Sequence, residues 1–300
     1  MNFLIRNYTT ERRKEDLEME GNFFTPEQIH GNMTKASVKK TKYTIPQLIM
    51  LGFMAGICIA LGAEASNVAM HGISHVGISR VIAGAVFPVG LITLLLLGGE
   101  LFTGNTMMLM GLVDRRIHLS GMLKNWFFVF VSNFVGGVFI AYIVSQTGQW
   151  NYSDNLLGAM TIKIALGKVT LSPWTAICSG IMCNIFVCAA VLIASGAQNM
   201  IGKIFGSFFP IFAFVISGFE HCVANMYYIP AGIMASHNAA YVEKAKEAYG
   251  ITASQLSQLT VGHFLYDNLL YVTIGNIIGG GVIVGLMYYF VFVRKIGKAK

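Results

Sequence analysis

The chain has 300 residues, of which 55% are hydrophobic and only 12% charged, with a formal net charge of +7 and a mean hydropathy of +0.61. A soluble domain carries about 25% charged residues, so this composition excludes an ordinary water-soluble protein. The apolar runs are long and continuous, which indicates membrane-spanning helices and argues against a β-barrel. Much of the positive charge flanks the apolar region, where it reports membrane orientation rather than nucleic-acid binding.

Residues 1–24 are polar and of mixed charge, and they lack the apolar core of a signal peptide. We expect them to form a disordered tail. The sequence Thr25-Pro26-Glu27-Gln28 is typical of a helix start, with Thr as the N-cap, Pro at the first position and Gln three residues after the cap. It predicts an amphipathic helix over 25–42 on the membrane surface. A transmembrane domain over 43–293 and a basic tail over 294–300 follow.

Six apolar stretches are each long enough to cross a hydrocarbon core of about 30 Å. We expect spans over residues 45–65, 78–98, 119–144, 174–194, 201–217 and 256–293, with two shorter apolar pieces over 106–113 and 223–235. The segments 146–173 and 236–256 are partly polar and are predicted to be loops. The distribution of Lys and Arg near the span ends favours an arrangement with both termini in the cytoplasm.

Two short sequences after the second and fifth expected spans repeat one pattern. GGELFTGN (98–105) and GFEHCVAN (218–225) both read Gly-x-Glu-x-x-x-x-Asn. The third span of each half repeats Asn-x-x-Gly-Gly with another Asn eight residues earlier, at Asn125, Asn133, Asn268 and Asn276. Because each half has three spans, the second half must be inverted relative to the first. Inverted repeats with broken helices place a permeation site near the membrane midplane, since the freed backbone groups must be satisfied by protein or line a water-filled cavity.

Glu100 and Glu220 stand at the two expected helix breaks. An ionised carboxylate at the membrane centre costs at least about 2.5–3.5 kcal/mol. We therefore expect each Glu to accept hydrogen bonds from the backbone amides that the break frees, a structural role at the breaks that Asn105 and Asn225 share. A proton relay is the alternative role for the two carboxylates.

His221 follows Glu220 directly, and its counterpart in the first half is Leu101, so the inverted scaffold does not require a polar group at this position. Histidine is the side chain whose charge changes most easily near neutral pH. Two interpretations stay open: a hydrogen-bond donor aimed into a pore, or a buried neutral histidine with a structural hydrogen bond.

The motifs GELFT, SGFEH…AN and TIGNIIGGG (273–281) resemble those of the formate/nitrite transporter family, and the resemblance covers most of the chain. That family consists of pentameric, six-span, aquaporin-like channels with one pore per protomer, which carry formate, nitrite or hydrosulfide. The resemblance implies an all-α channel of the cytoplasmic membrane, with inverted three-helix repeats, a small monovalent anion as substrate and a homopentameric assembly. It implies neither an enzymatic activity nor a cofactor.

The resemblance also assigns functional positions. It implies that Lys168, before the fourth span, draws the anion in, and that His221 hydrogen-bonds or protonates it between two apolar constrictions. Thr103 and Asn184 correspond to pathway residues. The constrictions correspond to Phe87 and Phe214 for one ring and to Leu91, Leu101, Phe102 and Val187 for the other.

Other functions share parts of this pattern. A water or glycerol channel has the same inverted plan but carries paired Asn-Pro-Ala motifs, which this sequence lacks. An ammonia channel is expected to place acidic and aromatic residues at its entrance, where this chain offers Lys168. A metalloenzyme needs clustered ligands, whereas the histidines here are scattered and the five cysteines lie inside apolar segments. The sequence does not select one physiological anion.

Overall fold

The structure is a computed structural model, and it describes residues 22–292. The tail expected over 1–24 therefore lies almost wholly outside the described residues, and the basic tail expected over 294–300 lies wholly outside them.

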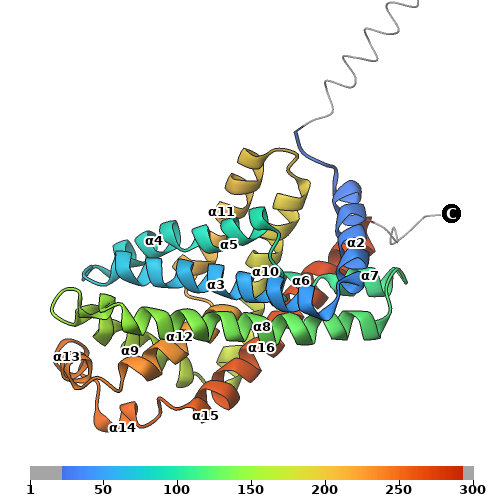
Figure 1. The fold of residues 1–300 in the computed structure, drawn as a ribbon. Coiled ribbons are helices and arrows are strands. Elements are labelled where there is room, and N and C mark those ends of the chain that lie inside the picture. The colour runs from blue at the N-terminus through green and yellow to red at the C-terminus, as the bar shows by residue number, and fades with distance from the viewer. Residues whose placement is uncertain (1–21, 293–300) are drawn as a thin grey trace, which may run out of the picture.

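The described residues are almost entirely helical (Figure 1). In chain order the helices are α2 Pro26–Lys42, α3 Ile45–Met70, α4 Val76–Val86, α5 Pro88–Leu97, α6 Phe102–Asn105, α7 Met108–Val113, α8 Leu119–Gln146, α9 Leu156–Val169, α10 Pro173–Gly196, α11 Met200–Ser217, α12 Cys222–Ala235, α13 Ala239–Tyr249, α14 Ala253–Leu256, α15 Val261–His263, α16 Leu270–Asn276 and α17 Met287–Phe292. A 3-10 turn, η1 (Gln149–Asn151), precedes α9, and the last span contains two π-helical segments, η2 (Phe264–Leu269) and η3 (Ile277–Leu286).

Within residues 22–292, six helical segments are long and apolar enough to cross a membrane. They are α3, α4 with α5, α8, α10, α11, and the run from α15 to α17. The segment from α6 to α7 and helix α12 are apolar but shorter. This arrangement confirms the predicted all-α fold with six spans and a helix break after the second and fifth.

The two helix breaks have the same backbone geometry. Helix α5 ends at Gly98 with φ of 80°, and α11 ends at Gly218 with φ of 72°, a left-handed conformation that glycine adopts without a steric penalty. Leu101 and His221 are extended residues directly before α6 and α12. The inverted repeat is therefore present in the backbone as well as in the sequence.

Helix starts follow local capping chemistry. The Thr25 side chain accepts a hydrogen bond from the Gln28 backbone N–H, and the Gln28 side chain accepts one from the Thr25 backbone N–H, so the predicted capping box is present. Helix α3 begins with the same capping box, formed by Thr44 and Gln47.

Three predicted boundaries and both predicted loops differ from the structure. The first span ends at Met70 rather than 65, the first short piece begins at Phe102 rather than 106, and the last span begins at Val261 rather than 256. The loop expected over 146–173 contains α9, which is mostly buried but too short to meet the length expected of a span. The loop expected over 236–256 contains α13 and α14; α13 consists mainly of Ala, Glu and Lys, which are strong helix formers, between an Asn238 cap and Gly250.

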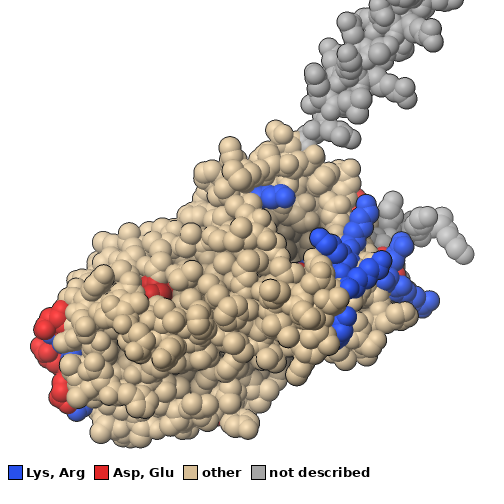
Figure 2. All heavy atoms as spheres, viewed as in Figure 1, with Lys and Arg blue, Asp and Glu red and all other residues tan. Residues whose placement is uncertain are grey.

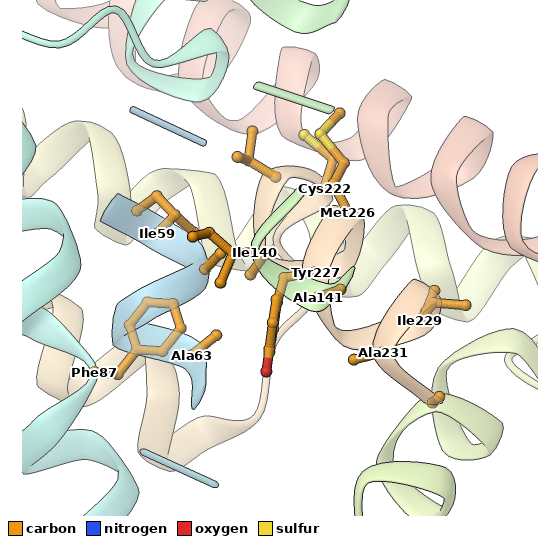
Figure 3. Close-up of a cluster of buried hydrophobic side chains, with 14 of the residues drawn as sticks. Ile59, Ala63, Phe87, Ile140, Ala141, Cys222, Met226, Tyr227, Ile229 and Ala231 are labelled. Carbon is orange, nitrogen blue, oxygen red and sulfur yellow. The ribbon is translucent and has the colours of Figure 1, made fainter. Parts of the chain in front are cut away.

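Helices α3 and α8 pack along their lengths, and α12 lies against both of them and against α9 (Figure 1). A Cβ atom built on Gly56 would lie 2.3 Å from the Asn133 carbonyl oxygen, so the close approach of α3 and α8 requires glycine there. Figure 3 shows Tyr227 of α12 reaching between Ala63 of α3 and Ala141 of α8.

The charged residues gather at the two ends of the molecule (Figure 2). Lys and Arg collect at the end where α2 and α7 lie, whereas Asp and Glu collect at the opposite end, near α13. The surface between the ends is largely uncharged in this view, as a membrane-spanning belt requires.

Candidate functional site

Two asparagines hold the backbone at the helix breaks. In the first half, the Asn133 Oδ1 atom accepts a hydrogen bond from the Phe102 N–H at 2.9 Å, and its Nδ2 donates to the carbonyls of Gly52 and Glu100 at 2.7 and 3.0 Å. Asn133 is fully buried on α8. One side chain therefore satisfies an amide and a carbonyl that the broken helix leaves free and ties them to α3.

Asn276 makes the equivalent bonds in the second half. Its Oδ1 accepts from the Cys222 N–H at 2.9 Å, and its Nδ2 donates to the carbonyls of Gly180 and Glu220 at 2.8 and 3.1 Å. The two sets of bonds agree atom for atom, so the Asn-x-x-Gly-Gly repeat marks the residues that secure the two half-helices.

Each glutamate at a break is paired with a lysine. Lys40 Nζ lies 2.9 Å from Glu100 Oε1, while Asn105 and Asn125 donate to Glu100 Oε2 at 2.7 and 3.3 Å. The amide of Asn105 also donates to Asn125 Oδ1 at 2.8 Å. A buried carboxylate is thereby balanced by one cation and two amide donors.

The same four-residue cluster occurs in the second half. Lys168 Nζ lies 2.9 Å from Glu220 Oε1, and Asn225 and Asn268 donate to Glu220 Oε2 at 2.6 and 3.4 Å. The expectation that the carboxylates accept from freed backbone amides is wrong: their partners among the described residues are side chains, because Asn133 and Asn276 already bind the freed amides.

The sequence predicts no specific role for Lys40, which only contributes to the positive charge before the first span. A signal was nevertheless present, since Lys40 stands twelve residues before Gly52 and Lys168 stands twelve before Gly180. Helices α2 and α9 each carry their lysine in the last turn. The inverted repeat thus includes the short helix before the first span of each half.

A cavity of about 570 Å³ borders the second cluster. It is lined by the turn between α3 and α4, by α9 with Lys168, and by Glu220 and His221 at the break. Phe87 and Phe214 also line it, and their rings meet edge to face with centroids 5.7 Å apart. The two rings are almost fully buried, so they form an apolar constriction beside a polar cavity.

His221 lies beside this constriction, with its ring centroid 6.0 Å from that of Phe214. Its Nδ1 accepts a hydrogen bond from the Ala224 N–H at 3.1 Å, which caps α12. A nitrogen that accepts carries no proton, so in this geometry the proton of the neutral ring is on Nε2. Nε2 lies 2.8 Å from Thr103 Oγ1 and donates to it. The two half-helices therefore meet through His221 and Thr103.

Thr103 and Asn184 form a second contact across the halves. Asn184 Nδ2 lies 3.2 Å from the Thr103 carbonyl, 3.1 Å from Thr106 Oγ1 and 2.6 Å from the Asn276 carbonyl. Its Oδ1 is buried and has no protein partner among the described residues. The amide nitrogen of Asn184 thus holds the segments together, and its oxygen is free to accept from a small polar species.

The residues expected in the second constriction are all buried and belong to the same continuous apolar cluster as Phe87 and Phe214; they are Leu91, Leu101, Phe102 and Val187. Phe102 packs edge-on against Trp126 and Phe130 of α8. The cavity of about 570 Å³ reaches Phe87 and Phe214 but none of these four.

Comparison with known proteins gives a consistent result. A family model described as formate/nitrite transporter matches residues 27–290. A probable formate transporter of Methanothermobacter thermautotrophicus is 37% identical over 92% of this chain and all of that protein. Formate channel FocA of Haemophilus influenzae is 37% identical over 79% of this chain and 84% of that protein.

Solved structures agree with the sequence comparison. The chain is similar to a structure described as a pentameric formate channel with formate bound, with a TM-score of 0.73 and 30% identity, covering 83% of this chain and 98% of that one. These proteins are transporters and channels, which confirms the expectation of a transport protein rather than an enzyme. The chain is a multi-pass membrane protein that belongs to the formate/nitrite transporter family.

Proposed function

We propose that this chain forms a homopentameric channel for formate and other small monovalent weak-acid anions, nitrite and hydrosulfide among them, with one pathway through each protomer. The observation that carries the proposal is the position of His221. Its Nε2–H lies beside the apolar constriction, and both His221 and Lys168 line the same cavity. A single donor next to a narrow apolar passage selects a small species that accepts hydrogen bonds.

Lys168 acts in this proposal together with Glu220. Because the pair is closed at 2.9 Å, the two charges largely cancel at a distance, and the long-range field of Lys168 is weak. An anion that reaches the cavity instead competes with Glu220 for the lysine. Lys40 and Glu100 offer the same exchange at the other end of the pathway, which fits movement in either direction.

His221 then supplies the hydrogen bond between the constrictions. An anion beside Nε2 replaces Thr103 Oγ1 as acceptor, and Thr103 is left to donate its own proton to the anion. If the ring first takes up a second proton from water in the cavity, at Nδ1, the resulting imidazolium can give its Nε2 proton to the anion and return to a neutral ring. The conjugate acid could then cross Phe87 and Phe214, because a neutral acid loses less hydration free energy than an anion in an apolar passage. The cap bond from Ala224 to Nδ1 opposes this step, since a doubly protonated ring cannot accept it.

The orientation follows from charge. Lys and Arg collect at the end of the molecule that carries α2 (Figure 2). Positively charged flanks favour the cytoplasmic side, so we assign this end of the molecule, and with it both termini, to the cytoplasmic side of the cytoplasmic membrane. The cavity with Lys168 and Glu220 then opens on the outer face.

The proposal is tested by flux into proteoliposomes. Stopped-flow uptake is measured for formate, nitrite, hydrosulfide, acetate, ammonia and glycerol, with empty liposomes and Lys246→Ala as controls, because Lys246 is an exposed lysine on α13 that does not line the cavity. Faster uptake of formate than of acetate, with ammonia at the empty-liposome rate, is the expected result. Uptake of ammonia or glycerol without formate would replace the anion channel by a neutral-solute channel.

A further inference from the structure

The outer part of the cavity carries more positive charge than the Lys168–Glu220 ion pair accounts for. Three cationic side chains line it, Arg80, Lys163 and Lys168, against one carboxylate, Glu220. Glu220 is committed to Lys168 and two asparagines. Within residues 22–292, neither Arg80 nor Lys163 lies within ion-pair distance of an acidic group. The mouth of the cavity therefore holds two uncompensated positive charges.

Both cations are held in place by neutral contacts. Lys163 Nζ lies over the Tyr249 ring, 4.3 Å from its centroid. Burial raises the pKa of the Tyr249 phenol, so this ring is neutral and gives Lys163 a face without a counter-charge. The Arg80 guanidinium rests on Gly218, where a Cβ atom would lie 2.2 Å from Nη1. Glycine at 218 thus both terminates α11 and makes room for Arg80 beside the helix break.

The inverted scaffold does not require Arg80. Lys163 has an equivalent in Lys35, since each stands five residues before the lysine of its cluster. Arg80 has none, because the corresponding position in the second half is Met200. Gly98, the counterpart of Gly218, has open space where Gly218 meets the guanidinium. Arg80 is therefore an additional cation at the cavity with Lys168 and not at the equivalent place in the first half. A residue that departs from an internal repeat in this way indicates a role specific to its own side of the membrane.

We propose that Arg80 and Lys163 form an outer binding site for small carboxylate anions at the mouth of the cavity, and that this site takes a dicarboxylate such as oxalate more tightly than formate. The inference rests on the proposed function in that it treats this cavity as the entrance of an anion pathway. A monocarboxylate passes inward to Lys168 and His221. A dicarboxylate stays above the Phe87–Phe214 constriction, where it blocks the pathway from this side.

The expected contribution of Arg80 to binding can be calculated from the charge of the ligand. One unit charge about 4 Å away in water changes a binding constant about fivefold. Doubling the charge of the ligand doubles the interaction free energy, so the factor for a dianion is about 25-fold. Loss of Arg80 should therefore weaken oxalate binding about 25-fold and formate binding about fivefold, and salt of about 1 M should abolish most of both effects because the Debye length falls to about 3 Å.

Binding is measured on the purified full-length channel in uncharged detergent at low ionic strength. A ligand that binds only the folded protein raises its melting temperature. The rise in melting temperature during an oxalate or formate titration therefore gives the apparent dissociation constant of that ligand. The variants are Arg80→Gln, Arg80→Lys to restore the charge, and Arg116→Gln as a matched arginine control at the opposite end of the molecule. The expected result is a large loss with Arg80→Gln, recovery with Arg80→Lys and parent behaviour with Arg116→Gln.

Equal oxalate titrations for the parent and Arg80→Gln would overturn the proposal, as would equal losses with Arg80→Gln and Arg116→Gln, which indicate net charge alone. Arg80→Lys separates a charge effect from a folding defect, since both variants lose the guanidinium but only one loses the charge. The titration does not use flux. A protein that binds oxalate through Arg80 but conducts no formate would refute the proposed function and leave this site standing.

Discussion

Replacing Lys168 with Met should destabilise the channel strongly, because the change removes the cation and leaves Glu220 in place. The side chain of Lys168 is 14% exposed and that of Glu220 is 8% exposed. Breaking a buried pair by removing one partner costs about 3–5 kcal/mol. Since the pair lines a cavity, water reaches the remaining carboxylate, and the lower end, about 3 kcal/mol, is expected. This corresponds to more than a hundredfold change in the unfolding equilibrium, on the order of two factors of ten.

The second substitution of the cycle is Glu220→Gln. In the double variant the amides of Asn225 and Asn268 still find an acceptor oxygen in the introduced glutamine side chain, and no charge is left unpaired. Most of the lost stability should return. Lys246→Met is the control, because its pair with Glu243 is exposed and such pairs contribute about 0–1 kcal/mol. Unfolding of the purified channel in mild detergent, followed by circular dichroism, measures the parent and all the variants. A Lys168→Met variant as stable as the Lys246→Met control would refute the reasoning, and the lysine would then act on anions alone.

Three further predictions concern the pathway and its packing. Phe214→Ile should widen the constriction and admit acetate and lactate in liposome flux assays; an unchanged order of anions with an intact fold would remove Phe214 from the passage. His221→Asn should weaken the dependence of formate flux on pH, because Asn donates a hydrogen bond but does not titrate; identical flux-against-pH curves for parent and variant would leave His221 a structural donor. Gly280→Ala should lower stability by about 1–3 kcal/mol, since its methyl group would lie 2.2 Å from Asn184 Nδ2. Gly262→Ala, with its nearest neighbour at 3.7 Å, is the matched control, and equal melting temperatures would contradict the packing argument.

The inverted repeat could be predicted from sequence because the residues that secure each break are few, polar and surrounded by apolar sequence. Asn133 and Asn276 stand out for that reason, and the structure shows the bonds that explain them. Lys40 could not be recognised as the counterpart of Lys168 in this way, because no constant offset in residue number relates equivalent positions in the two halves. Lys40 and Lys168 are 128 positions apart, Glu100 and Glu220 are 120 apart, and Asn133 and Asn276 are 143 apart. Loops of unequal length between the helices shift the alignment each time.

The partners of Glu220 and His221 could not be predicted for a different reason. Sequence spacing indicates which backbone groups a helix break frees, but not which side chain from another helix arrives there. The freed amide of Cys222 is bound by Asn276, and Glu220 instead pairs with Lys168, which lies 52 positions earlier in the chain. The hydrogen bond from His221 to Thr103 joins residues 118 positions apart, and only the meeting of the two half-helices brings them together.

The asparagine clamps at the two breaks also bear on how the chain enters the membrane. Helix α12 has 14 residues, about 21 Å at 1.5 Å per residue, and falls short of a hydrocarbon core of about 30 Å. Its first amide is bound by Asn276, which is synthesised 54 residues later, and α6 depends in the same way on Asn133. Neither half-helix can rest in lipid when it leaves the translocation machinery, because its free amide has no partner there. We therefore expect each half-helix to stay against the preceding spans until α8 or α16 has been synthesised, so that Asn133 or Asn276 binds the free amide before the segment is exposed to lipid.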